Sequence, residues 1–102
     1  MIEVNGKNYE LKFNLGRLKL VEKANGMPTV ADIVRTNGAL SISTLEAFFS
    51  YCLKEEGADV FLPAKKGAEI ADALIETEGY MKVNNMVIEK LSEDMPFLFP
   101  TA

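Results

Sequence analysis

The chain has 102 residues, of which 48% are hydrophobic, and its formal charge is −4. This length fits one domain, and no stretch approaches the roughly 20 apolar residues that a helix needs to span a bilayer. The chain has no histidine and a single cysteine, Cys52, which removes the commonest general base and metal ligand and excludes a thiolate zinc cluster. Without these groups, we expect a protein that is not an enzyme and binds no metal or cofactor. The start of the chain also lacks the basic and apolar segments of a signal peptide, so we expect the protein to be cytoplasmic.

An N-terminal β-hairpin is predicted by the dipeptide Asn5-Gly6, because both residues tolerate the positive φ angles of a two-residue turn. The turn determines the register, with Val4 opposite Lys7 and Ile2 opposite Tyr9. A lone hairpin is marginally stable, so helices must cover its apolar side. That side comprises Ile2, Val4, Tyr9, Leu11 and Phe13.

The first predicted helix covers residues 15–24, with Asn14 as its cap and Gly26 just beyond its end. Arg17 falls inside the apolar arc of this helix, beside Val21. We expect its aliphatic stem to pack over the core while the guanidinium reaches a carboxylate at the edge. The alternative is that Arg17 recognises a partner, because arginine is enriched in binding hot spots.

Two capping boxes predict the next two helices. Thr29 with Asp32 opens a short helix, and Ser43 with Glu46 opens the most regular helix of the chain, which Gly57 closes. We expect apolar contacts in the short helix from Val30, Ile33 and Val34. The regular helix has the i, i+3, i+4, i+7, i+8 stripe of a core-facing helix. Its members are Leu45, Phe48, Phe49, Cys52 and Leu53.

Proline and glycine delimit the last two predicted helices. Pro63 suits the first turn of a helix that ends at Gly79, and a final helix covers residues 81–94 before Pro96 stops it. We therefore predict a mainly α fold, a compact bundle of about five helices with a short N-terminal β-hairpin. It forms one domain over residues 1–102, made of a hairpin (1–13), a helical body (14–95) and an apolar C-terminal tail (96–102).

The final helix is apolar on more than one side, which favours either a central position with packing on both sides or an exposed interface. One of its stripes repeats every seven residues. In the tail that follows, large apolar side chains lie between two prolines that disfavour a helix, at a terminus where disorder is normally expected. The tail either folds back over its own core or docks on a neighbouring chain. With Arg17, the candidate partner-binding residues are Met81, Ile88, Met95, Phe97, Leu98 and Phe99.

Four segments of the chain carry a resemblance to a known family. In order they are NGKNYELKFNLGRLKLVEK, NGALSISTLEAFFSYCLKEEG, a helix that closes at Glu78-Gly79-Tyr80 and a PFLF end. Together they resemble the tail assembly chaperones of long-tailed phages and prophages of Gram-positive bacteria. The resemblance covers nearly the whole chain. Members of that family are small, mostly helical and non-enzymatic, and they keep the tape-measure protein soluble while tail-tube subunits polymerise around it. The resemblance therefore implies a protein of the bacterial host cytoplasm. Its implied partner is the tape-measure protein, with the tail-tube protein as a further candidate and no nucleic acid, membrane or cofactor.

The alternative is a small phage regulatory protein that binds DNA or a regulator through residues 17–35. The charge balance argues against it, because residues 39–102 carry five basic and eleven acidic side chains. A third hypothesis, an enzyme that uses the carboxyl pair Glu69 and Asp72, would require a deep pocket lined by both groups, whereas such pairs usually lie on solvated helix surfaces. The sequence leaves open whether the chain forms a homo-oligomer.

Overall fold

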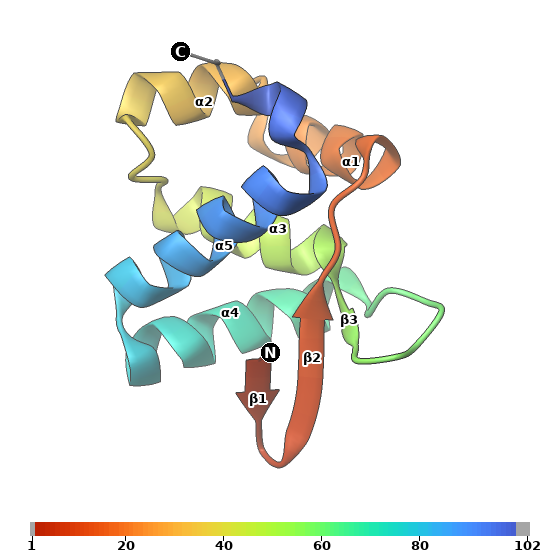
Figure 1. The fold of residues 1–102 in the computed structure, drawn as a ribbon. Coiled ribbons are helices and arrows are strands. Elements are labelled where there is room, and N and C mark those ends of the chain that lie inside the picture. Colours follow the sequence, from red (N-terminus) through yellow and green to blue (C-terminus); the bar gives the residue numbers. More distant parts are fainter. Residues whose placement is uncertain (1, 100–102) are drawn as a thin grey trace.

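The computed structural model describes residues 2–99, so residues 100–102 of the predicted tail lie outside the described part. A helical body lies above and beside one small antiparallel sheet (Figure 1), which confirms the predicted mainly α fold with an N-terminal hairpin. None of the helices described in residues 2–99 has both the length and the apolar character that crossing a bilayer requires. In chain order the elements are β1 (Ile2–Val4), β2 (Lys7–Leu11), α1 (Leu15–Asn25), α2 (Thr29–Thr36), α3 (Ile42–Cys52), β3 (Leu53–Glu55), α4 (Ala64–Glu78), α5 (Tyr80–Asp94) and the 3₁₀ turn η1 (Pro96–Leu98).

The predicted hairpin is confirmed in both its turn and its register. Asn5 and Gly6 have left-handed φ angles of 52° and 80°, which the two-residue turn requires. Ile2 lies opposite Tyr9, as predicted, and both side chains are buried. The helical body therefore covers the apolar side of the hairpin.

A third strand completes the sheet and corrects the predicted end of the third helix. α3 ends at Cys52 rather than at Gly57, and β3 pairs with β2 so that Leu53 lies opposite Leu11. The apolar pattern could not distinguish the two conformations, because Leu53 is buried in either one. The second edge of β2 decides the outcome, since its backbone groups need partners beside the core. The Lys12 N–H accordingly donates to the Cys52 carbonyl at 2.8 Å.

Both predicted capping boxes are wrong. Thr29 is the first residue of α2 rather than its cap, and its N–H donates to the Glu22 carboxylate of α1 at 2.6 Å. The cap of α3 is Ser41, whose Oγ accepts the Thr44 N–H at 3.1 Å. Leu40, just before this cap, is buried in the core. The chain therefore enters α3 from a core position, two residues earlier than the capping pattern predicted.

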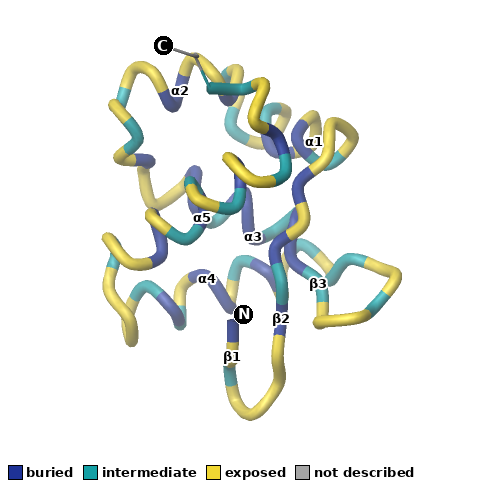
Figure 2. The backbone as a smooth tube through the Cα atoms, in the orientation of Figure 1, coloured by how far each residue is buried: buried dark blue, intermediate teal, exposed yellow. Residues whose placement is uncertain are grey.

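α3 lies at the centre of the fold, with α1, α4 and α5 packed around it (Figure 2). The hairpin side closes the core, because the Phe13 ring meets the Phe48 ring edge-on with centroids 5.5 Å apart. The predicted core stripe is confirmed, since none of its members has exposed surface: Leu45, Phe48, Phe49, Cys52 and Leu53.

α4 approaches α3 so closely that Gly67 has no room for a side chain. A Cβ atom built at Gly67 would lie 2.2 Å from the carbonyl oxygen of Phe49 and 2.9 Å from the Cα of Ser50. Backbone atoms cannot move aside by changing rotamer, so the two helices would have to separate. The glycine is therefore required by packing and not by its backbone conformation.

We expect Gly67→Ala to lower the free energy of unfolding by about 1–3 kcal/mol, as overpacked cores do, although alanine favours a helix over glycine by about 1 kcal/mol. Gly16→Ala in α1 is the matched control, because a Cβ there would meet only the Asn14 side-chain oxygen at 3.4 Å. Urea denaturation of both variants measures the effect. Equal or increased stability of Gly67→Ala would contradict the close α3–α4 packing.

Candidate protein-interaction surface

The apolar stripe predicted on α5 with a spacing of seven residues, Met81, Ile88 and Met95, does not form one surface. Met81 is 61% exposed at the start of the helix, whereas Met95 is 2% exposed, and Ile88 is half-buried against the core between them. Met95 follows the last residue of α5 and has non-helical angles of φ −139° and ψ 63°, so the helical wheel does not apply to it. Of the three predicted side chains, only Met81 is largely open to a partner.

The described part of the tail folds back and also exposes one large ring. Pro96–Leu98 forms a single 3₁₀ turn, so a short helical turn follows the first proline despite the expectation that the prolines would exclude one. Leu98 and Phe99 pack partly on the core, while Phe97 is 66% exposed. Within its described part, the tail therefore exposes one large side chain, Phe97, two residues after the buried Met95.

Arg17 contacts an aromatic ring instead of the predicted carboxylate. The cap of α1 is as predicted, since Asn14 Oδ1 accepts the Arg17 N–H at 2.9 Å. The guanidinium carbon lies 3.9 Å from the centroid of the Phe61 ring, a cation–π contact with the segment that precedes α4. This contact occupies the guanidinium within the protein, which weakens the hypothesis that Arg17 recognises a partner.

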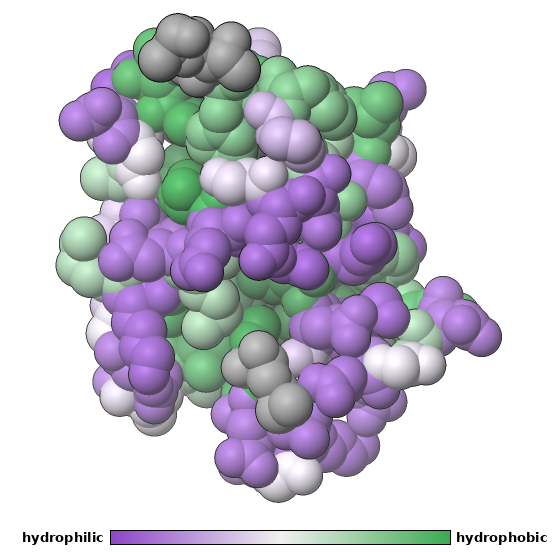
Figure 3. Space-filling model, viewed as in Figure 1, coloured by the Kyte–Doolittle hydropathy of each residue, from purple (hydrophilic) through white to green (hydrophobic). Residues whose placement is uncertain are grey.

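The exposed apolar side chains concentrate at one end of the molecule, the upper end in Figure 1, where α1, α2 and η1 lie. Five of the eight large hydrophobic residues that are exposed within residues 2–99 belong to these three elements. Figure 3 shows hydrophobic surface over this end and hydrophilic surface over much of the rest. We call this set the apolar end: Leu15, Leu20, Val30, Val34 and Phe97.

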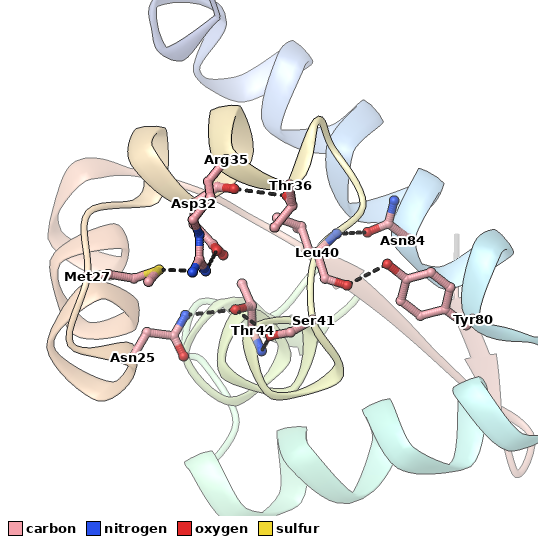
Figure 4. Close-up of polar contacts among 10 residues, drawn as sticks. All are labelled: Asn25, Met27, Asp32, Arg35, Thr36, Leu40, Ser41, Thr44, Tyr80 and Asn84. Carbon is pink, nitrogen blue, oxygen red and sulfur yellow. Dashed lines mark hydrogen bonds and ion pairs between the residues drawn. The ribbon is translucent and has the colours of Figure 1, made fainter.

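The inner face of α2 is largely polar, and its outer face carries exposed valines. Ile33 is the one large apolar side chain that α2 buries, so the predicted core contacts of Val30 and Val34 are wrong. Asp32 is 2% exposed and accepts a hydrogen bond from Arg35 Nη2 at 3.0 Å (Figure 4). Its second oxygen, Oδ2, has no partner within residues 2–99. α2 is thus attached with little apolar burial and one unsatisfied carboxylate oxygen.

Two side chains of α5 hold the linker between α2 and α3 (Figure 4). The buried Asn84 accepts the Leu40 N–H at 3.0 Å and donates to the Gly38 carbonyl at 2.7 Å. The Tyr80 hydroxyl donates to the Leu40 carbonyl. Sequence reasoning missed this link, although Asn84 lies next to Val83 on the buried side of the helix, where an asparagine needs polar partners.

The carboxyl pair of the enzyme hypothesis does not line a common pocket. Glu69 and Asp72 are both exposed on α4, and the hollow of about 330 Å³ beside the hairpin is lined by Glu69 without Asp72. A side-chain hydrogen bond with Asp72 raises the pKa of Glu46, with burial and repulsion between the two carboxylates adding to it. Within residues 2–99, no three acidic or cysteine side chains are grouped to hold a metal ion.

Cys52 is a buried core thiol. Its burial raises the pKa of the Cys52 thiol to about 12, while the charge of Arg17 lowers it and that of Asp94 raises it. Since the thiolate is the nucleophile, the side chain is unreactive at neutral pH. It therefore belongs to the packing and takes no part in the candidate surface.

Comparisons of the chain with protein-family models, with curated proteins and with solved structures give no match.

We expect Asn84→Ala to lower the free energy of unfolding by about 1–3 kcal/mol, because it leaves the Leu40 N–H and the Gly38 carbonyl without their partner. Asn85→Ala is the matched control, since its side chain is exposed on the same helix and should change stability by less than about 0.5 kcal/mol. Urea midpoints of the two variants decide the matter. Indistinguishable midpoints would show that the link does not stabilise the linker.

The raised pKa of Cys52 predicts a loss of stability at alkaline pH. The native state keeps this thiol protonated up to pH about 12, whereas the ordinary thiol pKa is 9.0, so the stabilisation is complete below pH 9 and is lost as the pH rises towards 12. Between pH 8 and pH 10 we expect the free energy of unfolding to fall by about 1 kcal/mol from this group.

Urea denaturation across this pH range, compared with Cys52→Ala, measures the effect. Cys52→Ala should be less stable at every pH, yet its free energy of unfolding should not show the fall between pH 8 and pH 10 that comes from the thiol. An identical slope in both proteins would contradict the assignment. A thiol reagent should likewise label wild-type Cys52 at pH 8 only after denaturation.

Proposed function

We propose that this protein is a non-enzymatic phage tail assembly chaperone that binds the tape-measure protein in the cytoplasm of the bacterial host and aids assembly of the tail tube. The observation that carries the proposal is the apolar end, where most of the exposed large hydrophobic side chains are gathered. Clustered exposed apolar side chains usually mark a contact surface. The sequence resemblance described above supplies the identity of the proposed partner.

The proposed mechanism is reversible masking of apolar surface. The tape-measure protein exposes apolar helical stripes before the tube forms, and the apolar end covers them. Phe97 is suited to be an anchor, because a large ring buries much area at low entropic cost, while Val30 and Val34 add a rigid aliphatic surface. Each contact is small, so binding to a long partner is modest per site and strengthened by the number of chaperones bound. Tail-tube subunits can then displace them.

The proposal predicts that co-expression with a tape-measure protein from the same gene neighbourhood raises the soluble fraction of that partner. The double variant Val34→Asp/Phe97→Asp should lose the effect, since it places charges where apolar contact is needed. Both side chains are more than 60% exposed, so we expect the variant to fold. Circular dichroism of the purified variant checks this.

Val60→Asp is the matched control, because Val60 is 73% exposed but lies in the loop before α4, outside the three elements of the apolar end. It should keep partner solubility at the wild-type level. Absence of any increase in soluble tape-measure protein with the wild-type chain, together with no co-purification, would refute the chaperone function. An increase that survives Val34→Asp/Phe97→Asp would place the contact elsewhere on the protein.

A further inference from the structure

The apolar end is also the basic end of an acidic protein. α1 and α2 together carry four basic and two acidic side chains, a charge of +2, which leaves −6 on the rest of the chain. η1 carries no charge. The two helices that carry four of the five apolar side chains proposed to meet the partner therefore have a net charge opposite in sign to that of the whole molecule.

The two acidic groups of this end are already used inside the protein. Glu22 accepts the Thr29 N–H, and Asp32 is buried in its pair with Arg35. Lys19 and Lys23, in contrast, form no ion pair with any residue of the described part of the chain. The charge that faces solvent at this end is thus positive and unneutralised.

The two lysines lie among the exposed apolar residues of α1. Lys19 and Lys23 are one helical turn apart and share the exposed side of the helix with Leu15 and Leu20. On α2, Val30 and Val34 are also one turn apart and form an apolar row of the kind that packs into the groove of a second helix.

We propose that the apolar end receives an amphipathic helix whose apolar stripe is flanked by acidic side chains. This rests on the proposed function and names the chemistry of the tape-measure segment that binds. Apolar contact supplies the affinity, and the lysines select acidic flanks and speed association. A helix of about 20 residues is about 30 Å long, so a segment of that length suffices as a probe.

A protein helix fits this surface better than DNA. Duplex DNA is bound through many phosphate contacts, whereas α1 and α2 offer two lysines without an ion pair in the described part of the chain, beside the exposed Leu15 and Leu20. Both arginines of the region are occupied, Arg17 by the Phe61 ring and Arg35 by Asp32. Desolvating the apolar side chains against phosphate would gain nothing, while a helix with an apolar stripe covers them.

The test uses overlapping peptides of about 20 residues that tile the tape-measure protein, titrated against the whole chain by fluorescence anisotropy. We expect binding by peptides with acidic residues beside an apolar stripe, and weaker binding at higher salt. Lys19→Glu/Lys23→Glu should weaken that binding about tenfold or more. Lys65→Glu/Lys66→Glu is the matched control, since these lysines are exposed on α4 and should leave binding unchanged.

The outcomes separate this inference from the proposed function. Peptide binding or partner solubility that is unaffected by Lys19→Glu/Lys23→Glu would overturn the acidic-helix inference and leave the chaperone function standing. Failure of every peptide and of the co-expression test would refute both. Two other results would also overturn the inference. The first is a DNA duplex that binds more tightly than any peptide and no longer binds Lys19→Glu/Lys23→Glu. The second is dimerisation of the wild-type chain that Lys19→Glu/Lys23→Glu abolishes.

Discussion

The fold depends on the complete burial of α3. A domain of this size buries only about two-thirds of the surface that its unfolded chain exposes, so its core is built around one helix that the other elements surround. Gly67 makes this packing tight, because α4 rests directly on the backbone of Phe49. The hairpin and β3 close the same core from the sheet side, where Phe13 meets Phe48. α2 and η1 lie at the edge of this packing, and their outer side chains Val30, Val34 and Phe97 are available for contacts with a partner.

α2 is held in place mainly by polar groups. It buries one large apolar side chain, and its carboxylate oxygen Asp32 Oδ2 has no partner within the described residues. Segments with little apolar burial open at low free-energy cost, so α2 is expected to be among the least stable parts of the molecule. Asn84 and Tyr80 compensate by holding the linker that follows α2. The outer face of α2 is thereby presented at a defined position without being covered.

Local signals in the sequence predicted most of the fold, because turn and cap chemistry acts over a few residues. Asn5-Gly6 predicted the hairpin register and Asn14 the start of α1, and the structure confirms both. Local signals also failed at both capping boxes, since Pro28 and Ser41 take the cap positions instead of Thr29 and Ser43. The other errors occur where distant contacts decide. Leu53 suits the core in a helix or a strand, and only the free edge of β2 selects the strand. Met95 continues the seven-residue spacing of Met81 and Ile88 in the sequence, but α5 ends at Asp94, before Met95.

The candidate surface was harder to predict than the core, because periodicity shows which residues share a face and not which face is covered. The sequence predicted Val30 and Val34 as core contacts, yet α2 buries Thr29, Asp32 and Ile33 instead, and of the apolar end only Phe97 was predicted to bind a partner. The distribution of charge over the molecule explains how it can expose these apolar side chains and still avoid self-association. Copies of an acidic chain repel one another over most of their surface, which limits self-association through the apolar side chains. A positive rim beside those side chains lowers the barrier for an acidic partner instead, so solubility and partner binding follow from the same distribution of charge.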